Sequence, residues 1–303
     1  MVPDRSVLAP GAHLQIYLDA IPATSAADRA AKLDVELEAW RATGVAGVIL
    51  HGFPRSLPGV YDALAKVVAN HGLPCGAAMG LDEAHVDAAT KGAALGELAA
   101  RCDCYVALAD CETHYDASPT RKEEMRQLGA AFRARAPSAT CIAQPWPEPL
   151  LHATFPYEEE NAFVDANAYQ AYFNAWKGSR GAHRYASLDP VFRDQWVKLE
   201  ATRLAACPRP TMLTIEGYGW DDIVWDCVDC LLRNESVIVW CDPFPSRTVK
   251  NAIRVVGALA ARGFTGPTAV RDFQADATCA GAFTGAIDGK CGPITMGALG
   301  IAG

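Results

Sequence analysis

The chain has 303 residues, of which half are hydrophobic and 20% are charged, so it can form one large core with or without a small appendage. Its formal net charge of −8, without a basic stripe, argues against a nucleic-acid partner. It has no run of about 18 apolar residues and no apolar N-terminal leader, so we expect neither a membrane span nor a Sec signal.

Short apolar strands alternate with amphipathic segments through residues 1–264. The predicted strands are Leu14–Leu18, Ala46–Leu50, Pro74–Met79, Cys104–Ala109, Thr140–Ala143, Ala162–Ala166, Thr211–Ile215 and Val237–Trp240. The predicted helices are Ala27–Thr43, Val60–Asn70, Asp82–Arg101, Thr120–Ala136, Pro190–Ala206, Trp220–Asn234 and Ser246–Arg262.

This alternation predicts a parallel sheet, because strands that are apolar throughout are typical of sheets covered on both faces. Eight such units in about 250 residues favour a (β/α)8 barrel over residues 1–264, with a doubly wound open sheet as the alternative. The fifth unit is the weakest. Gln144–Glu160 is rich in Pro and Glu, so we expect a long loop there, with Glu158-Glu159-Glu160 solvated.

Acidic residues stand where the predicted strands end. In a barrel of this kind, the carboxyl ends of the strands carry the chemistry. Burying a carboxylate is costly unless it has a task, so packing does not explain this arrangement. The acids at or near these ends are Asp19, Asp110, Glu112, Asp165, Glu216 and Asp242.

Asp110 and Glu112 are the most informative of these acids. They stand two apart on an extended segment, so their side chains point the same way with backbones about 6–7 Å apart. Two carboxylates this close do not both ionise freely, so one pKa should be raised. An acid that holds its proton beside an ionised partner is what glycosidic cleavage requires.

At these positions the chain resembles the family 25 glycoside hydrolases, which are lysozyme-type barrels. That family carries an Asp on its first strand, an Asp-x-Glu on its fourth and an Asp on its last. Asp19, Asp110-Cys111-Glu112 and Asp242 stand at matching places. The resemblance implies that Glu112 is the catalytic acid and Asp110 its electrostatic partner. The chain departs from the family in reading Asp-Ala-Ile after its first strand, in Cys111, and in the extra acid Glu216.

Aromatic and amide side chains near the same strand ends suit a sugar-binding groove. Flat rings stack on pyranose faces and amides bond hydroxyl groups, although barrel aromatics also serve as core. The candidate substrate-binding residues are Gln144, Trp146, Tyr169, Gln170, Tyr172, Tyr218, Trp220 and Trp240. His51 also ends a strand, but a lone histidine there is read as a structural residue.

The C-terminal residues 265–303 carry a second pattern. Val270-Arg271-Asp272-Phe273-Gln274, then Asp288-Gly289-Lys290-Cys291-Gly292-Pro293-Ile294-Thr295, resembles a small peptidoglycan-binding module. The resemblance implies wall-binding roles for Phe273, Gln274, Asp288, Gly289 and Thr295, in a module shorter than its relatives. The alternative is a helical hairpin that packs on the barrel.

The chain has eleven cysteines without the pattern of a disulfide scaffold. Most are expected to be buried thiols, whereas Cys279 and Cys291 flank the C-terminal hairpin and are placed to link it in an oxidising compartment. No histidines stand at ligand spacing beside the cysteines, so we predict no metal and no cofactor.

Together these features predict a lysozyme-like endolysin that cleaves peptidoglycan glycan strands. Glu112 would protonate the leaving oxygen. Asp110, alone or with Asp19, Glu216 or Asp242, would stabilise the positive centre, direct a water or direct the substrate's acetamido group. One alternative is a non-catalytic glycan-binding virion or surface protein with a degenerate barrel, and another is a barrel enzyme that acts on an unrelated sugar. Without a Sec signal, we expect cytoplasmic synthesis followed by phage-type release or virion delivery to the cell wall.

Overall fold

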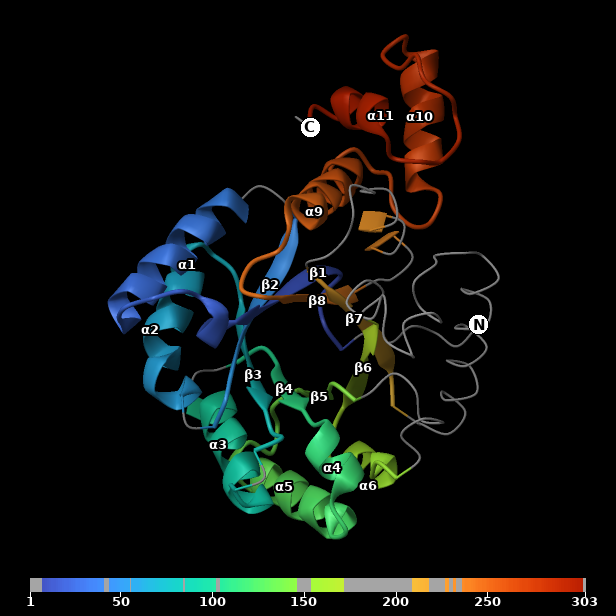
Figure 1. Ribbon diagram of the computed structural model, residues 1–303. Helices are drawn as coiled ribbons and strands as arrows, with labels where there is room; N and C mark the ends of the chain where they lie inside the picture. The colour runs from blue at the N-terminus through green and yellow to red at the C-terminus, as the bar shows by residue number, and fades with distance from the viewer. Residues whose placement is uncertain are drawn as a thin grey trace.

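The computed structural model is a closed barrel of eight parallel strands in the order β1-β2-β3-β4-β5-β6-β7-β8, which confirms the predicted (β/α)8 fold (Figure 1). The structure describes residues 7–40, 44–54, 56–83, 85–101, 104–145, 154–171, 209–217, 227–228, 231–232 and 236–301. The strands are β1 Gly11–Tyr17, β2 Val45–Gly52, β3 Cys75–Gly80, β4 Ala107–Asp110, β5 Cys141–Ala143, β6 Ala166–Ala171, β7 Thr211–Glu216 and β8 Ser236–Cys241.

Alternation along each strand divides the apolar residues into two clusters. One set points outward and packs against the helices, as Leu14 and Val48 do. The other fills the barrel, where Ile49, Leu108 and Ile238 are fully buried. Because side chains alternate, polar residues two positions further along the same strands also point inward, above this apolar layer.

Helices surround the barrel and connect its strands (Figure 1). The described helices are η1 Leu18–Ala20, α1 Ala26–Trp40, α2 Leu57–Asn70, α3 Ala88–Arg101, α4 Thr113–Ala117, α5 Arg121–Arg135, α6 Tyr157–Asn161, α9 Arg247–Ala260, α10 Ala269–Cys279 and α11 Pro293–Ala298. Of the predicted helices, Pro190–Ala206 lies outside the described residues and Trp220–Asn234 lies largely outside them.

Helices α3 and α5 approach closely because α3 carries a glycine at the contact. A Cβ at Gly92 would stand 2.1 Å from the Leu128 carbonyl oxygen, so no other residue fits without moving a helix backbone.

The sixth unit differs from the prediction in where its strand begins and in the position of Asp165. Strand β6 begins at Ala166, whereas Ala162–Ala166 was expected. The apolar pair Phe163-Val164 suggests a strand but packs outside the barrel, in the cluster that faces the helices. Asp165 therefore precedes the strand and lies at its amino end, where its carboxylate is 2.9 Å from Arg133 Nη2 and accepts the Cys141 N–H at 2.8 Å. Asp165 is a structural anchor, not part of the acidic end.

Of the acidic run that was expected to be solvated, only Glu158 is exposed. Helix α6 contains Glu158-Glu159-Glu160, and Glu159 and Glu160 are 7% and 0% exposed. Glu159 is compensated by Arg126, whose Nη2 donates to it at 2.9 Å. The helix turns Glu159 toward α5 and buries Glu160, which a charge pattern alone does not predict.

The C-terminal helices α10 and α11 lie beside α9 (Figure 1). The rings of Phe264 and Phe273 meet edge to face at a centroid distance of 5.8 Å. Cys279 is exposed, Cys291 is buried, and both are free thiols, so the expected link between them is not formed. Among the helices within the described ranges, none combines the length and apolarity that a bilayer crossing needs.

Candidate functional site

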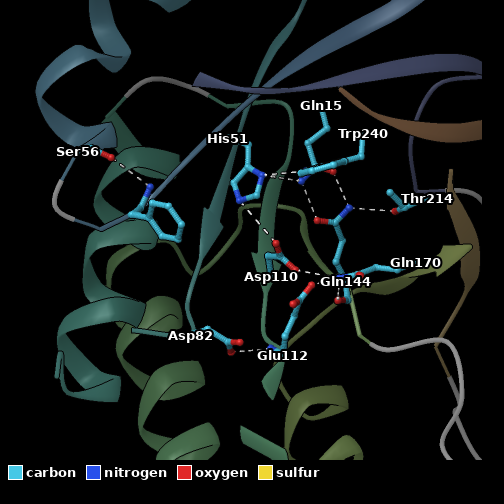
Figure 2. Close-up of polar contacts among 11 residues, drawn as sticks. Gln15, His51, Ser56, Asp82, Asp110, Glu112, Gln144, Gln170, Thr214 and Trp240 are labelled. Atoms are coloured by element: carbon cyan, nitrogen blue, oxygen red, sulfur yellow. Dashed lines mark hydrogen bonds and ion pairs between the residues drawn. The ribbon is translucent and has the colours of Figure 1, made fainter. Parts of the chain in front are cut away.

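The acid pair lies at the carboxyl end of β4, as the spacing predicted. Asp110 is the last residue of the strand and Glu112 follows two positions later. A single amide holds both, because Gln170 Nε2 on β6 donates to Asp110 Oδ1 at 3.1 Å and to Glu112 Oε1 at 2.6 Å (Figure 2). Two carboxyl groups therefore share one donor inside the mouth of the barrel.

The environment of Asp110 raises its pKa well above the ordinary value. Burial is the largest cause, because it disfavours the charged form, and the negative charges of Glu112, Asp82 and Glu160 add to it. The predicted raised pKa is thus located at Asp110, the deeper member of the pair. The arrangement favours a proton held between two carboxyl groups.

Asp82 supports the pair from the neighbouring strand. It follows β3 and its Oδ1 accepts the Glu112 backbone N–H at 2.7 Å (Figure 2). The bond fixes the chain at the point where Glu112 leaves the strand. Asp82 is not among the acids predicted at the strand ends. The sequence nevertheless indicates it, because Asp82 directly follows the apolar stretch Ala77–Leu81.

A belt of buried polar side chains crosses the barrel beneath the acids (Figure 2). Gln15 and Gln144 exchange two amide hydrogen bonds of 2.8 and 2.6 Å. Gln144 also donates to Thr214 Oγ1 at 3.0 Å. His51 Nδ1 lies 3.3 Å from both Gln15 Nε2 and Trp240 Nε1. Strands from across the barrel are therefore linked by side chains, and the acids stand on a rigid floor.

Of the predicted substrate-binding residues whose side chains the structure describes, two are buried and one is partly exposed. Gln144 is 1% exposed and is engaged within this belt, so it forms the floor and not a sugar contact. Gln170 is equally buried and serves the acids. Trp240 is half-buried, and its ring stacks against Tyr17 at a centroid distance of 6.3 Å and an angle of 23°. Of these three, Trp240 keeps a partly exposed ring at the mouth.

Asp19 and Asp242 stand at the rim near Tyr17. Asp19 lies 3.7 Å from Arg29 and accepts the Ser56 hydroxyl at 3.4 Å. Asp242 is exposed and joined to Pro243 by a cis peptide. Burial, and then the charges of both aspartates, raise the pKa of Tyr17. The described polar contacts of Asp19 are thus with α1 and with the turn before α2, whereas Asp110 and Glu112 share Gln170.

The remaining predicted site residues of the barrel lie outside the description. This holds for Trp146, Tyr172, Tyr218 and Trp220 as whole residues, and for the side chains of Tyr169 and Glu216.

The C-terminal motif forms a network of its own. Gln274 Nε2 donates to Asp288 Oδ1, the Lys290 carbonyl and Thr295 Oγ1 at 3.0–3.2 Å, and its Oε1 accepts the Gly289 N–H at 2.8 Å. Phe273, Gln274 and Thr295 are 5%, 1% and 2% exposed. The Asp-Gly turn has the expected positive φ, 75° at Gly289. Phe273, Gln274 and Thr295 are therefore buried residues that stabilise the loop. Wall binding by residues 265–303 stays a prediction.

Comparison with known proteins supports the fold. No family model matches the chain, and neither does any curated protein. Among solved structures, a GH5_18 protein from Streptomyces cattleya in complex with GlcNAc has a TM-score of 0.55 at 12% identity, over 82% of this chain and 80% of that one.

Two further structures have lower TM-scores. A glycoside hydrolase-like protein gives 0.49 at 10% identity over 82% and 88% of the two chains. A sialic acid aldolase from Aliivibrio salmonicida gives 0.48 at 11% identity over 84% and 75%. At 12% identity, the likeness to the Streptomyces cattleya protein shows the barrel fold alone.

Proposed function

We propose that the barrel is a glycosidase and that its substrate is the glycan strand of peptidoglycan. One observation carries the proposal: Asp110 and Glu112 share the Gln170 amide at the carboxyl end of β4, and the pKa of Asp110 is raised. A carboxyl pair that retains a proton is the acid catalyst glycosidic cleavage needs. The Streptomyces cattleya neighbour is a glycoside hydrolase that holds GlcNAc, a component sugar of peptidoglycan.

In the proposed reaction Glu112 delivers the proton that the pair shares, because it lies two residues further toward the mouth than Asp110. It gives its proton to the glycosidic oxygen while the bond to the anomeric carbon breaks. Water supplies the hydroxyl group at that carbon and its second proton restores the acid. Gln170 keeps the pair's geometry, and the negative charge that the pair carries after proton transfer stabilises the positive charge that develops on the sugar ring.

Segment 265–303 would act as an accessory that holds the enzyme on the wall. The proposal includes delivery to the wall by phage-type release or on a virion. The motif residues around Gln274 give this segment a defined loop, and the exposed side of that loop, at Asp288 and Ile287, is where contact with the wall is expected.

The test uses the full chain with purified cell walls. Glu112→Gln keeps the size of the side chain but removes the acid, so turbidity clearing should fall by about 10²-fold or more. Sedimentation with the walls should be unchanged. The matched control is Glu97→Gln on the exposed face of α3, which should behave as wild type.

Full clearing by Glu112→Gln would overturn the catalytic assignment. Wall binding by the wild-type protein without any release of reducing ends would instead support a non-catalytic glycan-binding protein. Cleavage of chitin or capsule fragments, but not of peptidoglycan, would retain the glycosidase and reject its proposed substrate.

A further inference from the structure

His51 has a buried imidazole ring, and one of its two nitrogens lacks a hydrogen-bond partner among the described residues. It lies on β2, its side chain points into the barrel, and it is 5% exposed. Its Nε2 is buried and has no hydrogen-bond partner among the described residues. That nitrogen faces Oδ2 of Asp110 at 3.6 Å, slightly beyond hydrogen-bond distance (Figure 2). The sequence pattern favours a structural histidine, but a structural histidine normally has both nitrogens satisfied.

The surrounding bonds determine which nitrogen of His51 carries the proton. An indole N–H only donates, so Trp240 Nε1, at 3.3 Å from His51 Nδ1, requires Nδ1 to accept. The Gln15 amide nitrogen faces the same atom at 3.3 Å and also donates to it. With Nδ1 accepting, a neutral imidazole carries its hydrogen on Nε2, which points at Asp110.

The orientation of the Gln15 amide is itself fixed, through a chain of bonds that starts on β7. Thr214 donates its hydroxyl hydrogen to the Ala168 carbonyl at 3.4 Å, so its oxygen accepts from Gln144 Nε2. That sets the orientation of Gln144, and the reciprocal amide pair then sets that of Gln15. Reversing both amides would keep the pair, but it would place the Gln15 oxygen against His51 Nδ1, which accepts from Trp240, and would require Thr214 to give up its bond to the Ala168 carbonyl.

Burial keeps His51 in this neutral form, because desolvation lowers its pKa to about 4. The Asp110 carboxyl consequently has one donor at each oxygen: Gln170 Nε2 at Oδ1, at 3.1 Å, and His51 Nε2 facing Oδ2. Donors at both oxygens fix the plane of the carboxyl group. Catalytic hydrogen bonds are often long before substrate binds and then shorten.

We propose that His51 is a positioning residue for the acid pair: a neutral imidazole, held as the Nε2–H tautomer by Gln15 and Trp240, which orients Asp110 from the side opposite Gln170. The proposal deepens the proposed glycosidase function and rests on it. The tautomer of His51 and the pKa of Asp110 are measured without substrate, so the positioning role and the glycosidase function can be refuted independently.

The tautomer is tested first, by long-range 1H–15N NMR of the histidine rings, with His51→Gln used to assign the signal. The wild-type His51 should show a protonated Nε2 and a bare Nδ1 at neutral pH. Trp240→Phe removes one donor to Nδ1 and should make the protonated-Nδ1 form detectable. A wild-type ring protonated at Nδ1, or at both nitrogens, would overturn the proposal.

The effect on Asp110 is tested by 13C NMR titration of its carboxyl carbon. The other acids whose charges act on Asp110, namely Glu112, Asp82 and Glu160, are unchanged in each variant. An N–H donor favours the charged carboxylate, so His51→Leu should raise the pKa of Asp110 by a further one pH unit, roughly. His51→Gln presents an amide N–H near the Nε2 position and should restore most of the wild-type value. An unmoved titration in a folded His51→Leu protein would contradict the proposal.

Cleavage of wall glycan supplies the functional readout. In His51→Leu, kcat should fall about tenfold with KM nearly unchanged, and His51→Gln should recover most of the loss. Equal kcat in all three proteins would overturn the positioning role. If the wild-type protein cleaves no glycan, the glycosidase proposal fails, while the tautomer and titration results still decide how Asp110 is held.

Discussion

Two buried glutamines lie at the centres of two polar networks, and the networks differ in one respect. Gln274 bonds a loop in which its partners are satisfied, and hydrogen bonds from the Lys290 backbone and from Gln274 lower the pKa of Asp288. Gln170 bonds two carboxyl groups, and burial, followed by the charge of Glu112, raises the pKa of Asp110. The first arrangement stabilises a fold, whereas the second retains an unfavourable charge pair, which is typical of a site that performs chemistry.

The contrast is tested most strongly by removing each glutamine. Gln170→Leu deletes the shared donor and should lower glycan cleavage by about 10²-fold, the usual effect of losing one preorganised hydrogen bond at a reacting centre. Gln274→Leu should leave kcat near wild type. Rates are measured on purified walls, with Gln127→Leu on the exposed face of α5 as control. Equal losses of cleavage rate in Gln170→Leu and Gln274→Leu would show that the two networks do not differ in function.

Replacing Asp110 by Asn should stabilise the protein at neutral pH. Because folding raises the pKa of Asp110 above its ordinary value of 3.8, stability is highest below that value and falls as pH rises toward the folded pKa. Asn does not titrate, so the stability difference should grow with pH by up to about 1.4 kcal/mol per unit. Denaturant melts of both proteins between pH 4 and neutral pH, with unfolding followed by circular dichroism, measure it. A difference independent of pH would contradict the raised pKa.

Gln274→Leu should act on stability instead of catalysis. It removes a buried amide, 1% exposed, that donates to three acceptors and accepts from Gly289, so residues 269–299 should lose about 1–3 kcal/mol. Hydrogen exchange at the Gly289 amide reports the change directly. Unaltered protection of that amide would show that the network does not hold the loop.

Asp288→Asn should give the smallest effect, with the opposite pH dependence to Asp110→Asn. Folding lowers the pKa of Asp288, so its contribution is present above its ordinary value of 3.8 and is lost as pH falls through the folded pKa. The group is exposed, so the contribution is less than about 1 kcal/mol after solvent screening. Exchange at Gly289 near pH 3 and at neutral pH measures it, with Asp276→Asn as control.

Most of the barrel follows from local signals in the sequence. Apolar runs locate the strands within a few residues, and Gly44 and Gly72, which follow the predicted helices Ala27–Thr43 and Val60–Asn70, have positive φ angles of 81° and 71°. Strand β6 is displaced because Phe163-Val164 is apolar for a different reason, packing against helices outside the barrel. Periodicity does not distinguish these two kinds of burial.

The site is predictable only where it is local. Alternation along one strand places Asp110 and Glu112 on the same side, and the structure confirms this. The Gln170 bridge and the belt beneath it join residues that are 58 and 129 positions apart, for Glu112 with Gln170 and for Gln15 with Gln144. Such contacts depend on barrel closure and register. The tautomer of His51 follows only once these contacts are known.

The central claim is that the Asp110–Glu112 pair cleaves a glycan, and mass spectrometry of digested cell walls tests it most directly. Wild type and Glu97→Gln should release muropeptides with new reducing sugar ends. Glu112→Gln should release about 10²-fold fewer. New peptide ends without reducing ends, or release of reducing ends by Glu112→Gln at the wild-type rate, would contradict the account.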